Sequence, residues 1–181
     1  MSERSDAVCE LKTSTARAGI ALGSNLGDRL ARLRAARASL SRLPGVERPL
    51  LTSAVYETEP VGCEPDAPEF LNAVIEIGYA GSAHKLLRAL GKIETAGGRS
   101  RAHARNASRT LDLDLLYFGD QTISESDLEL PHPRLHERRF VLEPLAEIRP
   151  DLVLPRATDN VAELLRRLPE SRPLLRVTSE W

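Results

Sequence analysis

The chain has 181 residues, a length that suits one domain with a sizeable core. Its 25 lysines and arginines nearly balance 26 aspartates and glutamates, so the net charge of −1 gives no sign of a nucleic-acid or membrane partner. No apolar run approaches the ~20 residues of a membrane span, and the two cysteines, Cys9 and Cys63, are too isolated for a disulfide framework or a CxxC metal site.

The first residues carry no sign of a sorting signal. Residues 1–17 are polar and mixed in charge, and they lack the apolar segment of a secretion signal. We expect them to be a disordered leader, followed by one domain over residues 18–178. Because the cysteine pattern fits a reducing compartment, we place the protein in the cytoplasm, without nucleic-acid or membrane partners.

Apolar periodicity predicts alternating strands and helices through the first hundred residues. The run Gly19–Gly23 is typical of a buried strand, and apolar residues at helical spacing follow it. Ser82 and Gly97 are the capping residues of a second helix. The expected elements are a strand at 19–23, a helix at 28–43, strands at 50–58 and 69–79, and a helix at 82–97.

The strand at 69–79 follows a proline-rich loop and places Phe70 and Asn72 on one face. An aromatic ring two residues from an amide can stack on a flat heterocycle and hydrogen-bond its edge. A core position is the alternative for Phe70, whereas a buried amide at Asn72 needs partners. Near the end of the second helix, the Glu94 carboxylate opposes the helix dipole, which indicates a hydroxyl or cation partner or else a plain surface glutamate.

The most informative stretch is Arg109–Leu116, whose residues alternate between the two faces of a predicted strand. Leucines occupy one face, which is typical of a core. Asp112 and Asp114 share the other face, roughly 7 Å apart along the strand. Such carboxylates repel each other unless a cation lies between them, and Mg²⁺ held by carboxylates and substrate phosphates is the usual solution. A polar strand face exposed to solvent is the alternative.

Arginines cluster before this acid pair, and no acid occurs from Thr95 to Leu111. Guanidinium groups suit phosphate oxygens, so anion-binding groups adjoin a predicted cation site. A nucleic-acid patch would look similar but would not need the acids. The arginines of this stretch are Arg99, Arg101, Arg105 and Arg109.

After the acid strand, prolines hold His132 in an extended or turn segment, and Arg138 and Arg139 follow within a few residues. We interpret them as a second phosphate-facing cluster, although a lone histidine is usually structural. A short helix interrupted by Pro144 is expected at 140–148. A last helix begins at Asp159 or Asn160 and stops at Pro169.

The order of these elements predicts the fold class. Hairpin and crossover links between strands, with helices to one side, indicate an α+β sandwich of ferredoxin-like type. We expect an antiparallel sheet with helices packed on its faces. No internal repeat or domain linker is evident in the sequence.

A series of segments between Gly19 and about Leu154 matches one known family in order and spacing. They are Gly23–Gly27, Tyr56–Gly62, Phe70–Ala73, Arg109–Asp114, Pro131–Leu135 and Arg138–Leu142. Through them the chain resembles the 6-hydroxymethyl-7,8-dihydropterin pyrophosphokinases, enzymes of folate synthesis. The resemblance implies transfer of the β,γ-pyrophosphoryl group of ATP to the pterin hydroxymethyl group, with release of AMP and use of two Mg²⁺ ions.

The same resemblance implies roles for individual residues. Asp112 and Asp114 would hold the metal and would form the catalytic group together with Arg99 and Arg109. The pterin-binding residues would be Thr58, Val61, Phe70, Asn72 and Phe140, with the two phenylalanines enclosing the ring. The ATP-binding residues would be Glu94, Arg99, Arg109, Leu115, His132 and Arg138. We expect a monomer whose partners are ATP and a reduced pterin.

The chain departs from the family pattern in the arginine-rich loop. Asn106 occupies the place of a tryptophan that the family often has, and Ala107 and Ser108 replace a common Gly-Pro. One alternative is therefore a family member that binds pterin or ATP with impaired turnover. Another is a ferredoxin-like module that binds RNA or a different anion, although the sheet lacks a paired aromatic motif of the RNA-binding type.

Overall fold

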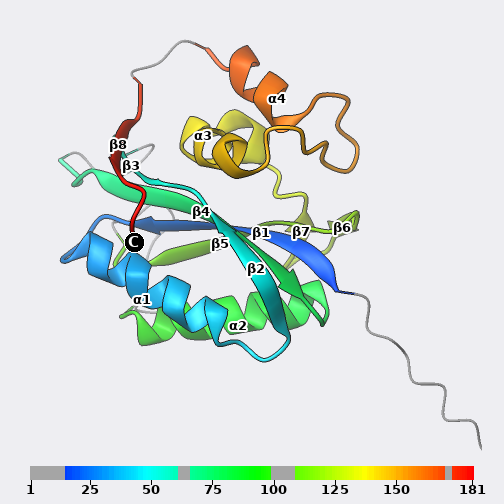
Figure 1. Ribbon diagram of the computed structural model, residues 1–181, viewed down its shortest axis with the longest axis horizontal. Coiled ribbons are helices and arrows are strands. Elements are labelled where there is room, and N and C mark those ends of the chain that lie inside the picture. Colours follow the sequence, from blue (N-terminus) through cyan, green and yellow to red (C-terminus); the bar gives the residue numbers. More distant parts are fainter. Residues whose placement is uncertain (1–14, 61–65, 99–108, 170–172) are drawn as a thin grey trace, which may run out of the picture.

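The computed structural model describes residues 15–60, 66–98, 109–169 and 173–181. A central sheet lies between two helical layers, with α1 and α2 covering one face and α3 and α4 the other (Figure 1). The sheet strands are β1 (Ala16–Ser24), β2 (Val46–Thr52), β3 (Val55–Thr58), β4 (Phe70–Tyr79), β5 (Asp112–Phe118) and β8 (Leu175–Thr178). The helices are α1 (Arg29–Ser41), α2 (Ala83–Ala96), α3 (Arg139–Ile148) and α4 (Val161–Arg167), with a 3-10 turn at Leu135–Glu137. A separate hairpin pairs β6 (Ile123–Ser124) with β7 (Glu129–Leu130).

The strand order is β5-β1-β4-β3-β8, and β2 also pairs with β4. The paired strands are antiparallel. Helix α1 connects β1 to β2, and α2 connects β4 to β5, so two β-α-β units interleave as in a ferredoxin-like fold. The predicted α+β class, with an antiparallel sheet and helices on its faces, is confirmed.

Side-chain caps begin three of the helices where the sequence predicted. Asp28 accepts the N–H of Ala31 at 3.0 Å, and Ser82 accepts the N–H of Lys85 at 3.2 Å. At α4, Asn160 forms a capping box with Glu163. Each cap satisfies backbone donors that have no partner within the helix, which fixes the first turn.

Both faces of β4 are buried, as expected for a strand between two helical layers. Ile75 and Ile77 join the core beneath α1 and α2, while Val74 joins the core beneath α3 and α4. Glu76, on the latter side, is fully buried. Its carboxylate forms ion pairs with Arg17 at 2.7 Å and Arg149 at 3.0 Å, and it accepts a hydrogen bond from the Tyr117 hydroxyl at 2.5 Å. These contacts provide the partners that a buried carboxylate requires.

The strand predicted at 50–58 is wrong in its extent, because two strands, β2 and β3, occupy this region in succession. Ser53, followed by Ala54, separates them. Its backbone N–H donates to the Val74 carbonyl, but its hydroxyl accepts the Val74 N–H at 3.0 Å, where a regular ladder would use a backbone carbonyl. The side chain thus replaces one bond of the ladder, and the chain bends beside β4.

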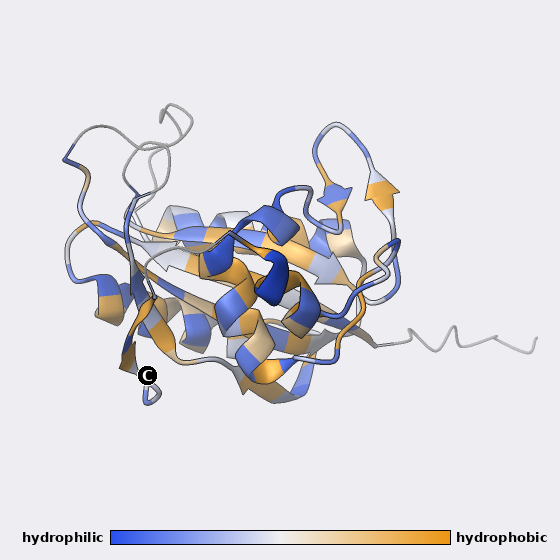
Figure 2. Ribbon diagram, turned by 90° about the horizontal axis from the view of Figure 1, so that it is seen from above, coloured by the Kyte–Doolittle hydropathy of each residue, from blue (hydrophilic) through white to orange (hydrophobic). Residues whose placement is uncertain are grey.

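The predicted interruption at Pro144 is also wrong, since Pro144 lies inside a continuous α3 and is buried. Proline removes one helical hydrogen bond, and burial of its ring offsets part of that loss. Seen from above, α3 and α4 carry both hydrophilic and hydrophobic residues, as a layer with one buried and one exposed side requires (Figure 2).

Ordered structure extends past the predicted domain limits at both ends. Ala16 and Arg17 belong to β1, while residues 1–14 of the expected leader lie outside the described residues. Strand β8 was not predicted, and Trp181 belongs to the core beneath α1 and α2. Within the described part of the chain, no helix is long and apolar enough to cross a membrane.

Candidate active site

A cavity of about 530 Å³ opens between one end of the sheet and the N-terminal half of α3. Residues from β1, β3, β4 and β5 line it on the sheet side, and the segment from His132 to α3 closes the opposite side. Nine of the residues predicted from the sequence line this one cavity. They are Thr58, Phe70, Asn72, Arg109, Asp112, Asp114, His132, Arg138 and Phe140.

The two carboxylates occupy the predicted face of β5. Leu113 and Leu115 are buried in the core beneath the helices, which fixes the strand, while the side chains of Asp112 and Asp114 keep 21% and 37% of their surface. Burial raises the pKa of Asp114, and the negative charge of Asp112 raises it further. The pair thus has the mutual repulsion that a shared cation would relieve.

Arginines approach both acids. Arg109 Nη1 lies 2.6 Å from Asp112 Oδ2, and Arg138 Nη1 lies 3.4 Å from Asp114 Oδ2. Burial alone would lower the pKa of Arg109, but the nearby carboxylates of Asp112, Asp114 and Glu94 together outweigh it, and the net shift is upward. Positive groups therefore surround the acid pair on two sides, an arrangement suited to phosphate oxygens near a metal.

A hydroxyl and an amide meet on the floor of the cavity. Asn72 Nδ2 donates to Thr58 Oγ1 at 2.7 Å across the β3–β4 pair. On the other side of β4, Gly23 of β1 lies so close that a Cβ there would approach Asn72 Oδ1 to 3.0 Å. The amide is therefore held in place by its two neighbouring strands.

His132 and Phe140 line the wall opposite the sheet. The backbone N–H of His132 donates to the Leu116 carbonyl at 2.8 Å, and its Nδ1 accepts the Arg134 N–H at 3.2 Å. Burial lowers the pKa of His132, which favours the neutral imidazole. The Arg138 guanidinium lies 5.6 Å from the centre of the Phe140 ring, so the aromatic wall and the phosphate-binding groups adjoin.

Two predicted residues lie outside this lining. Glu94 is buried and accepts the Leu113 N–H at 2.9 Å, so the surface-glutamate alternative is wrong. Leu115 packs in the core on the other face of the sheet. Val61, Arg99 and Asn106 lie outside the described residues.

Sequence reasoning missed the part played by Asn25. Its Oδ1 accepts the Arg109 N–H at 2.6 Å, and its own N–H donates to the Arg109 carbonyl at 3.1 Å. Asn25 thereby holds the backbone of an arginine 84 positions away in the sequence. The one sequence feature that could have identified Asn25 is its position in the Gly23–Gly27 turn, where the pattern indicated helix capping.

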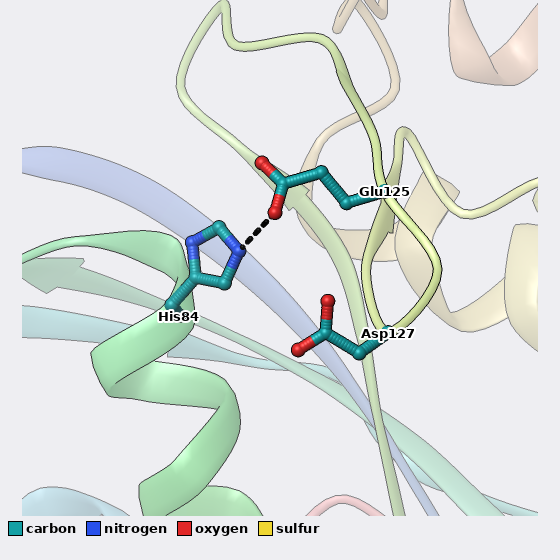
Figure 3. A group of neighbouring side chains, drawn as sticks. All are labelled: His84, Glu125 and Asp127. Atoms are coloured by element: carbon teal, nitrogen blue, oxygen red, sulfur yellow. Dashed lines mark hydrogen bonds and ion pairs between the residues drawn. The ribbon is translucent and has the colours of Figure 1, made fainter.

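A second group of potential metal ligands lies apart from this lining. His84 in the first turn of α2 faces Glu125 and Asp127 in the β6–β7 turn, and His84 Nε2 is 3.0 Å from Glu125 Oε2 (Figure 3). Both carboxylates are exposed. The His84–Glu125 contact on its own is a surface hydrogen bond that adds little stability.

Comparison with known proteins gives a consistent family. Residues 19–150 match the model of the 7,8-dihydro-6-hydroxymethylpterin-pyrophosphokinase family. The chain is 40% identical over 153 residues to the 2-amino-4-hydroxy-6-hydroxymethyldihydropteridine pyrophosphokinase of Haemophilus influenzae, covering 84% of this chain and 93% of the relative. It is 47% identical over 129 residues to the enzyme of the same name from Bacillus subtilis, covering 71% and 75%.

Solved structures show the same fold at low sequence identity. The chain superposes on wild-type Plasmodium falciparum HPPK-DHPS with pteroate at a TM-score of 0.67 and 13% identity, covering 85% of this chain and 44% of that one. The complex of the same protein with pterin and p-hydroxybenzoate gives a TM-score of 0.66 at 14% identity, covering 87% and 44%. The chain therefore spans less than half the length of these solved chains.

Proposed function

Since the chain belongs to the 7,8-dihydro-6-hydroxymethylpterin-pyrophosphokinase family, we propose that the cavity between the sheet and α3 is its active site. The chain is an enzyme of folate biosynthesis. It transfers the pyrophosphoryl group of ATP to the hydroxymethyl group of 6-hydroxymethyl-7,8-dihydropterin and releases AMP. The RNA- or anion-binding alternative is not favoured, because the matched family model and the two relatives above are pyrophosphokinases.

The pterin lies, in this proposal, between Phe70 of β4 and Phe140 of α3. Both rings line the same cavity from opposite walls, which is the arrangement that stacking on two faces of a flat heterocycle needs. Asn72 and Thr58 lie on the floor beside Phe70 and supply donors and acceptors for the ring edge. Val61 belongs to the same proposed set.

Asp112 and Asp114 would hold Mg²⁺, and we propose two ions. The residues fit the metal: both are hard oxygen donors, both line the cavity, and burial, followed by the negative charge of Asp112, raises the pKa of Asp114. Bound Mg²⁺ would neutralise phosphate charge and orient the attacking and leaving oxygens.

The remaining predicted residues would bind ATP, and those that line the cavity would contact its triphosphate. Arg109 and Arg138 flank the acid pair and carry planar guanidinium groups that match phosphate oxygens. Neutral His132 can donate a single hydrogen bond to a phosphate without adding charge. We include Arg99, Glu94 and Leu115 in the ATP-binding set. Glu94 and Leu115 do not line the cavity, and their proposed role is to fix the position of β5.

Catalysis by these residues consists of positioning and charge stabilisation. The pterin slot holds the hydroxymethyl oxygen facing the β-phosphorus, which makes the attack effectively intramolecular. Arginine side chains stabilise the negative charge that develops on the phosphoryl oxygens and exclude water from them. The observation that carries this proposal is the lining of one cavity by the aromatic pair, the amide–hydroxyl pair, the acid pair and the arginines.

The test is production of AMP from Mg-ATP and the reduced hydroxymethylpterin by the purified protein. Asp112→Asn, purified identically, is the control for contaminating enzymes, since it keeps the side-chain size and removes the negative charge of a metal ligand. AMP formation by the wild type and its loss in the control supports the proposal. Folded wild-type protein that forms no AMP above the control refutes it, and binding of both substrates without AMP identifies the low-turnover alternative suggested by Asn106.

We further propose that the enzyme acts as a monomer in the cytoplasm, with ATP and the reduced pterin as its partners. The cysteine pattern, which fits a reducing compartment, supports the cytoplasmic location. Light scattering coupled to size-exclusion chromatography, with the chain mass of 19.9 kDa as reference, measures the oligomeric state.

A further inference from the structure

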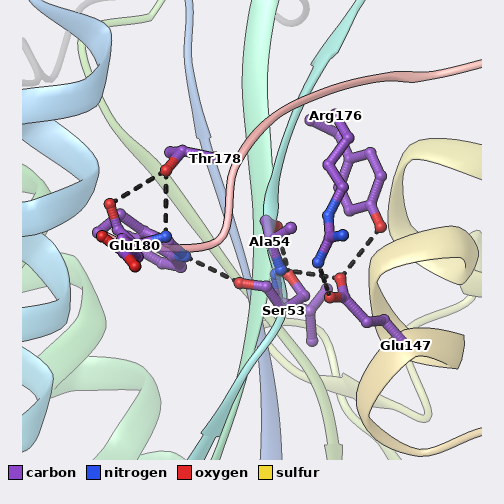
Figure 4. A network of polar contacts seen from close by, with 9 residues as sticks. Ser53, Ala54, Glu147, Arg176, Thr178 and Glu180 are labelled. Atoms are coloured by element: carbon purple, nitrogen blue, oxygen red, sulfur yellow. Dashed lines mark hydrogen bonds and ion pairs between the residues drawn. The ribbon is translucent and has the colours of Figure 1, made fainter.

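Glu147, in the last turn of α3, reaches the strand that carries Thr58 (Figure 4). Its Oε2 accepts the backbone N–H of Ala54 at 2.8 Å and the hydroxyl of Tyr56 at 3.0 Å. Its Oε1 accepts from Arg176 Nη2 of β8 at 2.9 Å. One carboxylate therefore links α3 to β3 through one oxygen and to β8 through the other.

These contacts tie together the two walls of the proposed pterin slot. Phe140 and Glu147 are seven residues apart in α3, about two helical turns, so they lie on the same side of the helix. Tyr56 and Thr58 are two residues apart in β3 and share a face of the strand. Tyr56 is also the register partner of Asn72. The anchor of α3 on the sheet thus lies next to the amide–hydroxyl pair.

The apolar contacts of α3 hold the helix against other strands. Val141, Leu142 and Leu145 pack in one cluster with Val74 of β4 and with Leu116 and Tyr117 of β5, and among the described residues this cluster includes none from β3. Apolar packing is strong but has little directionality, whereas hydrogen bonds fix both distance and orientation. The position of α3 relative to β3 is therefore the quantity that Glu147 is suited to set.

We propose that Glu147 is a positioning residue for pterin binding: by tying α3 to β3, it fixes the separation between Phe140 and the Thr58–Asn72 pair. This inference rests on the proposed function, which places the pterin between these residues. Burial and the hydrogen bond to Glu147 raise the pKa of Tyr56 to about 12, so the phenol remains a donor to the carboxylate at physiological pH.

The division of contacts between the two oxygens allows the links to be tested separately. Glu147→Gln can place its single oxygen at the β3 contacts and loses only the Arg176 pair, as does Arg176→Met. Glu147→Leu removes every link, and Tyr56→Phe removes one hydrogen bond to β3 while it keeps the ring. The readouts are KM for the pterin, KM for ATP, kcat and the melting temperature.

We expect Glu147→Leu to raise the pterin KM about tenfold and Tyr56→Phe about threefold, because charge-assisted hydrogen bonds to β3 are lost. Glu147→Gln and Arg176→Met should leave the pterin KM within about twofold of wild type, and all four variants should leave kcat and the ATP KM within about twofold. Arg149→Met is the matched control. It removes another ion pair of the α3 terminus, to Glu76 of β4, and should lower the melting temperature without changing the pterin KM.

A folded Glu147→Leu variant with an unchanged pterin KM would overturn the inference, because Glu147 would then stabilise the fold as Arg149 does. If Glu147→Leu does not fold, Tyr56→Phe decides, and an unchanged pterin KM in that variant has the same meaning. Phe140→Ala separates the two proposals. If Phe140→Ala raises the pterin KM and Glu147→Leu does not, only the role of Glu147 fails; if Phe140→Ala has no effect, the pterin site itself is wrong and the inference falls with it.

Discussion

Gly23 and Asn72 face each other on paired strands, and a Cβ on Gly23 would come within 3.0 Å of Asn72 Oδ1. Since Asn72 also donates to Thr58 at 2.7 Å, the amide is confined from both sides. The glycine is needed here for space and not for an unusual backbone angle, because the φ of Gly23 is not positive. A substitution at Gly23 therefore acts mainly on the amide.

We expect Gly23→Ala to displace the Asn72 amide and to raise the pterin KM at least about fivefold, since one hydrogen bond to a substrate edge is worth roughly 1 kcal/mol. Gly91→Ala in α2 is the control, because a Cβ there meets nothing within 4 Å. That variant should stabilise the helix by about 0.5–1 kcal/mol and leave the kinetics unchanged. Equal pterin KM values in the two variants would contradict the assignment of Asn72.

The acid pair should be required for activity but not for folding. Asp112→Asn and Asp114→Asn should each lower the rate of AMP formation by at least about a hundredfold, because each removes the negative charge of a metal ligand. Their melting temperatures should change little, since relief of the repulsion between the two carboxylates offsets the weakened contact with Arg109 or Arg138. Asp120→Asn, an exposed residue in the turn after β5, is the control and should resemble wild type. Full activity in both site variants would refute the metal assignment.

Tyr56 should make stability depend on alkaline pH. Burial and Glu147 raise its pKa from 10.0 to about 12 in the folded chain, so the folded state holds the phenolic proton more tightly than the unfolded state. The stabilisation is fully present below pH 10 and is lost between pH 10 and about 12. Wild-type protein should lose up to about 2 kcal/mol more unfolding free energy across this range than Tyr56→Phe. Urea unfolding of both proteins at a series of pH values measures this difference. Plots of unfolding free energy against pH that run parallel for wild type and Tyr56→Phe would contradict the prediction.

Trp181 should contribute to stability although it lies outside the predicted domain. Its ring is 9% exposed within the core beneath α1 and α2, and its Nε1–H donates to the Ser53 carbonyl at 2.8 Å. Trp181→Ala should lower the free energy of unfolding by about 3 kcal/mol, the usual cost of removing a buried aromatic ring. Leu175→Ala, at a site 62% exposed, should change it by less than about 0.5 kcal/mol. Similar urea midpoints for both variants would exclude a core role for Trp181.

The periodic features of this chain could be predicted because they are local. Alternation along residues 110–115 assigned the leucines to the core and the aspartates to the opposite face. Ser82 gave the start of α2, and the choice between Asp159 and Asn160 gave the start of α4 to within one residue. Strand period, helix period and capping all depend on residues within a few positions of one another. The family resemblance then linked Phe70, Asn72 and Phe140 before any contact between their elements was known.

Only the tertiary structure decided the features that depend on distant partners. Glutamate side chains are usually exposed, yet Glu94 is buried, and its carboxylate accepts a hydrogen bond from the N–H of Leu113 on another element. Ser53 ends β2 because its hydroxyl meets Val74, and Asn25 holds Arg109, 84 residues further along. The acid pair, in contrast, was determined by sequence alone, since two carboxylates on one strand face lie together in any fold that forms the strand. What the fold added was the opposite wall of the cavity, with Phe140 on α3 and Glu147 tying that helix to β3.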